Sequence, residues 1–364
     1  MEKSVEIPLY LDIVSKLKAE IESGRYRKRF PSEAQLVRRY KVSRQTIIRV
    51  MAELARAGLI ERYRGSGTVV SRKVNLTLGR IGLVLPWLSS APFYDAIAGV
   101  CREEGYTLLY RSIHHPCGFS IEERLREAQQ LAADFADARV SGLILQPVQD
   151  LAEAEDVNRE IVEAFQSKQI PVVLIDHDIC FLPQRSRFDV VAADNIHAGY
   201  LIGRHLIAQG AHNIAFLMHP NWAPTVHGRL NGVAAAVLEA GLEWSTRKNV
   251  LDAEPDDVKG IARAVRARRP DAIVCGNDIE AARLLKTLKT LRIRVPDRIM
   301  VTGIDDEPFA SLVTPSLTTV RQDFEQIAEV AARRLFERIR TPNADPVNIL
   351  LQTKLIVRES TGKK

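Results

Sequence analysis

The segment 43–56 carries basic and amide side chains on one face of a predicted helix and apolar side chains on the other. At 100° per residue the apolar arc holds Ile47, Val50, Met51 and Leu54. The opposite arc holds Gln45, Arg49, Ala52 and Arg56, while Arg44 and Thr46 lie in the first turn. Arg and Gln side chains form hydrogen bonds with base edges in the major groove of DNA, so the polar arc predicts a DNA-reading helix.

A second set of polar side chains follows apolar, strand-like runs. Asp176 follows "PVVLI", Asn277 and Asp278 follow "AIVCG", and Asp305 and Asp306 follow "MVTGI". Ligands of open parallel sheets bind at the carboxyl ends of the strands. Carboxylates and amides there, with an arginine and an aromatic wall, suit a polyhydroxylated small molecule. For Asp278 and Asp306 we favour a structural role, because an Asp after a strand often caps a helix or forms a turn.

The elements that must position the DNA-reading side chains are three helices and a hairpin. Leu9, Ile13, Leu17 and Ile21 at helical spacing predict a first helix, which Gly24 ends. The second helix begins after Ser32 and the third after Ser43, because Ser is a good N-cap, and Gly58 ends the third. Residues 59–70 then indicate two short strands around a glycine turn with basic residues at its tip.

Charge is concentrated in this N-terminal head. The first 79 residues carry 17 Lys and Arg against 8 Asp and Glu, a net of +9, whereas the remainder has a net of −3. Concentrated positive charge on a small domain is typical of a phosphate-backbone binder. The pattern predicts a winged helix-turn-helix in which the third helix enters the major groove and a wing, Arg62–Gly67, contacts the backbone or the minor groove. The alternative is a small helical adaptor with an exposed hairpin.

The head resembles the GntR (gluconate-repressor) class of winged-helix domains over residues ~5–71. The matching pieces are Pro31-Ser32-Glu33, Val42-Ser43-Arg44, Thr46, Leu54, Gly58-Leu59-Ile60 and Gly65-Ser66-Gly67-Thr68. The candidate DNA-binding residues are Ser32, Ser43, Arg44, Gln45, Thr46, Arg49, Arg64, Gly65 and Gly67. Ala34 and Ile48 stand where the class commonly has Arg, and Arg49 points about 100° further round the helix than Ile48. The operator sequence therefore does not carry over from the class.

Beyond a linker at residues 72–79 the pattern changes. From Arg80 onward, short runs rich in Val, Ile and Leu alternate with helical stretches. Continuous apolar strands with crossover helices indicate a parallel sheet covered on both faces. About 285 residues of this pattern are more than one such layer usually holds, so we expect two lobes.

This body resembles the effector domain of the LacI/GalR (lactose and galactose repressor) family, which has the periplasmic sugar-binding-protein fold, over residues ~80–364. Matching runs include "IPVVLID", "VVAADNIHAGYLIGRHLIAQG", "PDAIVCGND" and "VPDRIMVTGIDD". The candidate ligand-binding residues are Asp176, Arg229, Asn277, Asp305, Trp87, Phe93 and Trp222. Arg229 would form paired hydrogen bonds with ligand hydroxyls, a geometry that Lys does not supply. A GntR head on this body resembles the arabinose-repressor type of hybrid regulator, which does not by itself establish arabinose as the ligand.

The expected fold class is therefore multidomain, an α+β winged helix-turn-helix followed by a two-lobed α/β domain that is periplasmic-binding-protein-like. The resemblance implies three crossings between lobes, with lobe one at ~80–186 and ~317–340 and lobe two at ~187–316 and ~341–364. Ligand would close the hinge and change how two protomers present their heads. A two-fold homodimer would read a pseudopalindromic double-stranded operator with half-sites about 34–36 Å apart, or a multiple of that distance.

The leading interpretation is a cytoplasmic, ligand-responsive transcription factor that represses carbohydrate genes, with a mono- or disaccharide effector. The alternatives are a purine or other metabolite as effector, a role as activator, a solute-binding protein and an enzyme. The sequence has no apolar run of ~18 residues and no signal-peptide core. It also lacks the G-x-G-x-x-G, P-loop, G-x-S-x-G and H-E-x-x-H motifs. Four cysteines and eight histidines show no metal spacing, so we expect reduced thiols, no cofactor and no metal.

Overall fold

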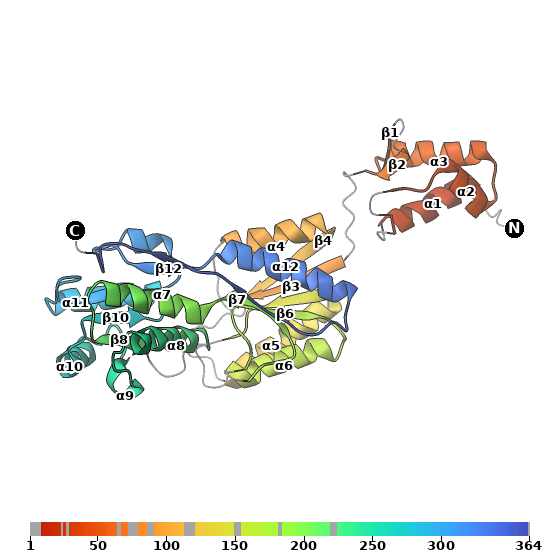
Figure 1. Ribbon diagram of the computed structural model, residues 1–364. Helices are drawn as coiled ribbons and strands as arrows, with labels where there is room; N and C mark the ends of the chain where they lie inside the picture. Colours follow the sequence, from red (N-terminus) through yellow and green to blue (C-terminus); the bar gives the residue numbers. More distant parts are fainter. Residues whose placement is uncertain are drawn as a thin grey trace.

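The computed structural model describes residues 9–22, 25–26, 29–63, 67–71, 79–85, 91–112, 121–148, 154–180, 184–218 and 224–362. Figure 1 shows a helical head with a short hairpin, and a body of two α/β lobes. Within the described ranges, no helix is both long enough and apolar enough to cross a membrane.

The head is built from α1 (Leu9–Glu22), α2 (Glu33–Tyr40), α3 (Arg44–Arg56), β1 (Ile60–Tyr63) and β2 (Gly67–Val70). Serine caps fix where two of the helices begin. The Ser32 hydroxyl accepts a hydrogen bond from the Gln35 N–H at 3.3 Å, and the Gln35 side chain accepts one from the Ser32 N–H at 2.8 Å. Ser43 accepts from the Thr46 N–H at 3.1 Å in the same way. Each cap satisfies backbone N–H groups that have no partner within the helix.

The head has a hydrophobic core of its own. Four side chains of α3 are completely buried, namely Ile47, Val50, Met51 and Leu54. They belong to a cluster of buried residues drawn from positions 13–70, with Leu17 and Ile21 of α1 among them. Because this cluster contains residues of the head only, the head has the internal packing of an independent folding unit.

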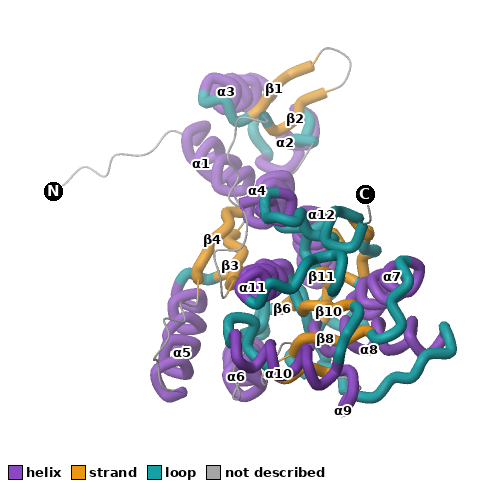
Figure 2. Tube along the Cα trace, turned by 90° about the vertical axis from the view of Figure 1, so that its left-hand side faces the viewer, coloured by secondary structure: helices purple, strands orange, loops and turns teal. Residues whose placement is uncertain are grey.

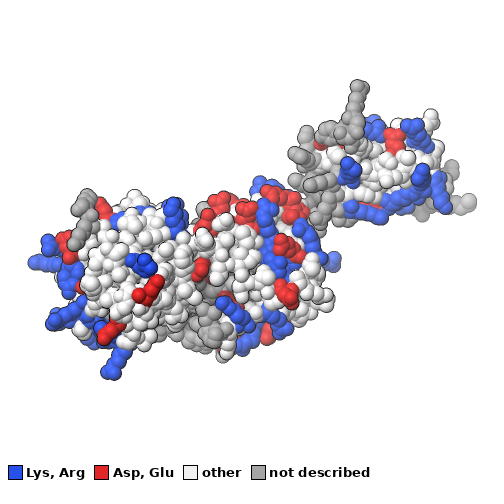
Figure 3. All heavy atoms as spheres, viewed as in Figure 1, with Lys and Arg blue, Asp and Glu red and all other residues white. Residues whose placement is uncertain are grey.

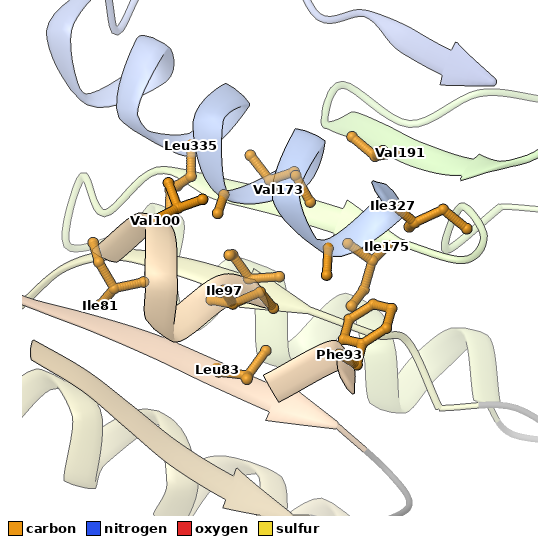
Figure 4. Packing of buried hydrophobic residues seen from close by; sticks show 14 of the residues in the cluster. Ile81, Leu83, Phe93, Ile97, Val100, Val173, Ile175, Val191, Ile327 and Leu335 are labelled. Carbon is orange, nitrogen blue, oxygen red and sulfur yellow. The ribbon is translucent and has the colours of Figure 1, made fainter. Parts of the chain in front are cut away.

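Lobe one contains a six-stranded parallel sheet in the order β13-β7-β6-β5-β3-β4. Its elements are β3 (Gly79–Leu85), α4 (Ala91–Glu103), β4 (Tyr106–Ser112), α5 (Ile121–Asp137), β5 (Val140–Leu145), α6 (Ala154–Gln166), β6 (Val172–Ile175), β7 (Asp189–Ala193), α12 (Phe324–Arg340) and β13 (Asn348–Leu351). One face packs on α4 and α12, as Figure 4 shows for Ile97 and Leu335 over Ile81 and Val173. The other face packs on α5 and α6. Because both faces are covered, the inner strands β5, β6 and β7 are almost wholly buried and rich in apolar residues.

Lobe two contains a four-stranded parallel sheet in the order β11-β10-β8-β9 and a separate antiparallel pair, β12–β14. Its elements are α7 (Asn195–Ala208), β8 (Ile214–Met218), α8 (Pro224–Glu239), α9 (Thr246–Asn249), β9 (Val250–Asp252), α10 (Val258–Arg268), β10 (Ala272–Cys275), α11 (Asp278–Thr290), β11 (Met300–Thr302), the 3-10 turn η1 (Pro308–Ser311), β12 (Thr319–Arg321) and β14 (Lys354–Ile356). Figure 2 shows α7 and α8 on one side of β8 and β10, with α10 and α11 on the other.

The sheets divide the body at other residues than the sequence pattern suggests. We expected lobe one to end near residue 186 and lobe two to include all of 341–364. In the structure β7 pairs with β6, and β13 pairs with β7, so residues 189–193 and 348–351 belong to the sheet of lobe one. Conversely, β12 pairs with β14 beside the sheet of lobe two. Two short apolar strands look alike in sequence, and only their pairing shows which sheet they join.

The cysteines of the described ranges are free thiols. Cys101 and Cys275 are buried, and Cys180 is half-buried. Burial raises the pKa of the Cys101 thiol to about 12, so it stays protonated and acts as a small apolar side chain. Cys117 lies outside the described residues.

Candidate functional site

The first candidate region is the outer face of α3 with its neighbours in α2 and the hairpin. Arg44 is 79% exposed, and its Nε donates to a carboxylate oxygen of Glu33 at 3.4 Å. Arg62 of β1 donates to the other oxygen of Glu33 at 2.9 Å. Glu33, at the start of α2, therefore connects the beginning of α3 with the hairpin. The same three elements surround a surface groove lined by Ser32, Glu33, Ala34, Val37, Arg38, Arg44, Gly67 and Thr68.

The remaining predicted DNA-binding residues have different surroundings. Ser43 and Thr46 are tied together at the N-terminus of α3, with their hydroxyl oxygens 2.8 Å apart, and Gln45 is exposed. Arg49 instead lies over the ring of Tyr10 in α1, with its guanidinium carbon 4.0 Å from the ring centroid. It also donates to the Tyr10 hydroxyl at 3.4 Å. The predicted wing-tip residues Arg64 and Gly65 lie outside the described residues.

Basic side chains dominate the surface of the head. Figure 3 shows Lys and Arg gathered along the lower edge of the head in that view, over α1, whereas the lobes show both charge signs interspersed. The net charge over the first 79 residues is +9, so the head attracts polyanions. The range of this attraction decreases as the salt concentration rises. This arrangement suits a surface that meets nucleic acid.

The second candidate region centres on Arg229, which is 6% exposed on α8. Its Nε donates to Asn195 Oδ1 at 2.8 Å, and one terminal nitrogen donates to the Gly276 carbonyl oxygen at 2.6 Å. The other terminal nitrogen lies 3.5 Å from Asp305 Oδ1. The guanidinium is thus held from three sides by α7, the end of β10 and the turn after β11. A cation so fixed can present its remaining donors without an ordering cost when a ligand arrives.

Two glycines allow α8 to bring Arg229 this close to α7. A Cβ atom on Gly199 of α7 would lie 1.9 Å from the Arg229 carbonyl oxygen. A Cβ atom on Gly232 of α8 would lie 2.0 Å from the Ile196 carbonyl oxygen. No real side chain fits such distances, so only glycine permits the helices to pack at this separation. The position of the arginine therefore depends on two residues without side chains.

Asp305 is the acidic partner of Arg229 in lobe two. It also accepts a hydrogen bond from the Gln322 amide at 2.5 Å. Burial raises the pKa of Asp305 to about 7. The charge of Arg229 opposes this shift, and the nearby carboxylate of Asp278 adds to it. Near neutral pH the group is therefore divided between an acceptor-only carboxylate and a protonated form that can also donate.

Asp176 is the acidic residue on the lobe-one side. It shares a hydrogen bond with His177 Nδ1 at 3.1 Å and accepts one from the Gln146 amide at 3.4 Å. Burial by itself would raise the pKa of Asp176. The hydrogen bond and charge of His177, joined by the charge of Arg229, outweigh burial and lower that pKa. Asp176 is therefore an ionised hydrogen-bond acceptor at neutral pH.

Backbone strain accompanies both carboxylates. Asp176 has a φ of 72° and Asp305 a φ of 124°, and Asp306 follows at 58°. A non-glycine residue with positive φ costs about 1–3 kcal/mol in the less populated regions, and such residues cluster at functional sites. The strain turns the chain at the carboxyl ends of β6 and β11, where the side chains can face the space between the lobes.

Asn277, Asp278 and Asp306 serve the local structure. The side chain of Asn277 is the N-cap of α11 and accepts from the Glu280 N–H at 2.8 Å. Asp278 is completely buried and accepts from the Thr319 hydroxyl at 2.6 Å and the Glu307 N–H at 2.9 Å. Burial raises the pKa of Asp278 to about 6. Asp306 pairs with Arg358 and Arg321, at 2.5 and 2.6 Å. A capping oxygen on Asn277 leaves its amide NH₂ as the group available to a ligand.

A pocket between the lobes adjoins these groups. Lobe one contributes Asp176, His177, Asp178, Cys180, Arg185, Val190, Ala192 and Ala193, with Asn348 and Leu350 from β13, and lobe two contributes Asp194, Asn195, Ile196, Pro224, Thr225 and Gly228. Of the predicted aromatic wall, Phe93 is 6% exposed in the core of lobe one, 6.5 Å from the Phe324 ring. Trp87 and Trp222 lie outside the described residues.

Four polar residues around Arg229 and the two carboxylates were not expected from the sequence. They are Gln146, His177, Asn195 and Gln322. The sequence could have indicated two of them, because Gln146 directly follows the apolar strand β5 and Asn195 lies two residues after β7. Asp176 follows β6 in the same way, at the end of a strand where ligands bind. Gln322 follows the short strand β12 at a lobe crossing, where no pattern of the chain marks it. Its side-chain oxygen is buried and has no partner among the described residues.

Comparison with known proteins gives two family matches. Residues 9–70 match "Bacterial regulatory proteins, gntR family", and residues 204–361 match "Periplasmic binding protein-like domain". The chain is 28% identical to the arabinose metabolism transcriptional repressor of Geobacillus stearothermophilus, with 99% of each chain covered. It is 31% identical to the HTH-type transcriptional repressor PurR of Proteus mirabilis (strain HI4320), over 82% of this chain and 84% of that protein.

Among solved structures, the chain is similar to a complex of the transcriptional regulator CelR with cellobiose. The TM-score is 0.63 at 23% sequence identity, with 97% of this chain and all of that chain covered (100%). This similarity supports the head-plus-two-lobe fold across nearly the whole chain.

Proposed function

The chain belongs to the family of bacterial transcriptional repressors that carry a periplasmic-binding-protein-like effector domain, here behind a gntR-type DNA-binding head. From this premise we propose that a neutral polyhydroxylated molecule, a mono- or disaccharide, binds between the two lobes and sets the affinity of the head for operator DNA. The single observation that carries the proposal is the buried Arg229, fixed between Asn195, Gly276 and Asp305 and close enough to Asp176 to lower its pKa.

The hydrogen-bonding groups suit hydroxyls. A sugar hydroxyl donates one hydrogen bond and accepts others, so adjacent hydroxyls pair well with a carboxylate on one side and a guanidinium on the other. Asp176 supplies an ionised acceptor, Arg229 supplies fixed donors, and Asp305 supplies a group near its titration point. Such a set recognises the positions of several hydroxyls rather than a single charge.

The charges favour a neutral ligand over a phosphorylated one. Two carboxylates face one guanidinium, whose nitrogens already have protein partners on three sides. A phosphate group would bring one to two further negative charges beside Asp176, and a like charge within a few ångströms is unfavourable. The relative named as an arabinose metabolism repressor is consistent with a neutral sugar as effector.

A purine or another planar metabolite is the alternative effector. Its ring N–H groups would also pair with the carboxylates, but a flat ring needs an aromatic side chain to stack against. Phe93 is packed into the core of lobe one, and the other two predicted wall residues lie outside the described ranges. The contacts of the described residues thus support hydroxyl recognition more directly than ring stacking.

For the DNA side, we propose that residues 1–71 form the operator-binding unit and that α3 enters the major groove. Arg44 and Gln45 would contact base edges, with Ser32, Ser43 and Thr46 near the phosphates and Arg64, Gly65 and Gly67 contributed by the wing. Arg49 is held over Tyr10 and would have to leave that ring to reach DNA. Two protomers related by a two-fold axis would bind a pseudopalindromic operator.

Thermal melting of the purified full-length protein tests the ligand class. The panel contains L-arabinose, other pentoses and hexoses, their phosphate esters, and purine bases. A ligand at 100 times its Kd stabilises the folded state by about 2.7 kcal/mol, which shifts Tm by several degrees. We expect a neutral sugar to raise Tm and to change the affinity for operator DNA.

The Arg229→Ala variant provides the control, because adding sugar should not change its Tm. A shift produced by a purine base and by no sugar would overturn the sugar assignment and leave the DNA-binding head unaffected.

A further inference from the structure

One exposed apolar side chain of α3, Ile48, lies beside the polar arc of that helix, on the side nearer Arg44. Ile48 is 40% exposed, although the four other large apolar residues of that helix, Ile47, Val50, Met51 and Leu54, are completely buried. At 100° per residue, Ile48 points between the directions of Arg44 and Gln45, with the exposed Ala52 one turn further on. The helix is thus fully packed without Ile48, and folding of the head does not require this side chain to be apolar.

The surroundings of Ile48 indicate what it meets. A single exposed apolar residue needs no explanation by itself. Here, however, it is flanked by Arg44, which is 79% exposed, on a head whose net charge is +9 over 79 residues. A surface of that charge around an apolar centre is complementary to a polyanion that carries apolar groups inside a charged frame.

Double-stranded DNA has this combination in its major groove. Phosphates line both edges of the groove, and the C5-methyl group of thymine is the apolar group that base pairs display on its floor. The arginine next to Ile48 in sequence is engaged elsewhere, because Arg49 lies 4.0 Å above the Tyr10 ring. The exposed side chains that remain in this part of the helix are Gln45, Ile48 and Arg44, and Arg44 would exchange its 3.4 Å contact with Glu33 for a contact with a base.

We propose that Ile48 is a specificity-determining residue that reads thymine through its 5-methyl group at one position of each operator half-site. This proposal rests on the proposed role of α3 as the DNA-reading helix. It adds a T·A pair to the operator at the position that faces Ile48, one helical turn beyond Arg44 and Gln45 on α3. Apolar contact of this kind discriminates thymine from cytosine and from uracil, because neither carries the methyl group.

Selection of binding sites from a random double-stranded DNA library by the full-length protein, followed by deoxyuridine substitution, tests the proposal. Each thymine of the selected site is replaced in turn by deoxyuridine, which removes only the methyl group, and Kd is measured by fluorescence anisotropy. We expect one thymine per half-site at which this replacement weakens wild-type binding about fourfold, the effect of about one buried methyl group.

The variants separate this contact from other causes. Ile48→Ala should bind the thymine and deoxyuridine sites equally well, whereas Ile48→Val should keep most of the difference. Leu312→Ala serves as the matched control, because Leu312 is 79% exposed in lobe two and should not alter the response. Equal binding of both sites by the wild type, or an unchanged difference in Ile48→Ala, would overturn the proposal. A library from which no sequence is enriched would instead overturn the operator-binding function on which it rests.

Discussion

The head and the effector body use arginine in opposite ways. Arg44 on α3 is 79% exposed and has one carboxylate partner among the described residues, at 3.4 Å, whereas Arg229 on α8 is 6% exposed and is held by partners from three segments. An exposed arginine costs little to leave unpaired and is free to adjust to a long, charged surface. A buried arginine is expensive to leave unpaired, so its environment must be built around it. The comparison indicates that the head is adaptable and that the cleft is preorganised.

The largest expected effect is that of Arg229→Ala. Removing the guanidinium leaves Asp305 buried without its counter-charge, which should lower the free energy of unfolding of the effector domain by about 3–5 kcal/mol. Chemical denaturation measures this change, and calorimetry should detect no sugar binding.

Arg229→Lys distinguishes charge from geometry. It should regain part of the stability without regaining ligand binding, because an ammonium group does not reproduce the planar fork. Sugar binding by Arg229→Lys at wild-type affinity would show that the cleft needs only a positive charge.

The second prediction tests preorganisation through packing. Gly232→Ala places a Cβ 2.0 Å from the Ile196 carbonyl oxygen, so α7 and α8 must separate, at a cost of roughly 3 kcal/mol. The same change at Gly99 of α4 meets no atom within 4 Å and should be neutral or stabilising by up to about 1 kcal/mol. Thermal melting of the two variants gives the comparison. Equal melting temperatures would mean that α7 and α8 can separate at this point without a cost in stability.

The third prediction concerns pH. The pKa of Asp305 is raised to about 7 in the folded protein, above the value of about 3.9 for an exposed Asp. Protonation of Asp305 therefore contributes its full free energy to folding below pH ~4, and this contribution is lost as the pH rises through 7. Between pH 5.5 and 8 the loss should be on the order of 2 kcal/mol, and the raised pKa of Asp278 adds a loss of the same sign near pH 6.

Asp305→Asn provides the check, because an amide does not titrate. Urea denaturation at several pH values should give a shallower dependence for this variant than for the wild type. Parallel curves for the two proteins would show that Asp305 does not titrate in this range.

The smallest expected change in stability is that of Arg44→Ala. Because the side chain is so exposed, the free energy of unfolding should change by less than about 0.5 kcal/mol. Operator affinity should nevertheless fall by roughly 10–100-fold, the contribution of one base contact. Fluorescence anisotropy measures the affinity, with Arg266→Ala on α10 as a control for lost charge. If Arg266→Ala weakened binding as much, the effect of Arg44 would be general electrostatics and not base contact.

Much of the architecture could be predicted from the sequence. The two-domain class is confirmed, with a gntR-type match at residues 9–70 where ~5–71 was expected and a periplasmic-binding-protein-like match at residues 204–361 within the expected body. The helix starts at Ser32 and Ser43 and the buried arc of α3 followed from side-chain chemistry and a 3.6-residue period. The DNA-binding and ligand-binding residues stay predictions.

The sequence was least informative about what each predicted side chain contacts. Phe93 was expected at the cleft and packs in the core of lobe one, and Arg49 was expected on the reading face and lies over Tyr10. Gln322, which donates to Asp305 from a position 17 residues away, was not expected at all. Aromatic and basic residues serve equally well in cores, in ion pairs and at ligands, so residue type alone leaves these roles open.

Features that depend on neighbours a few residues apart were readable from residue order, namely the helix caps, the apolar faces, the buried strands and the basic charge of the head. The tertiary structure alone decided which distant segments meet. It placed β13 beside β7, more than 150 residues earlier in the chain, and it collected the partners of Arg229 from α7, the residue after β10 and the turn after β11. The physical reason is that a local pattern reflects backbone geometry over one or two turns, whereas a contact between distant residues depends on how whole elements pack.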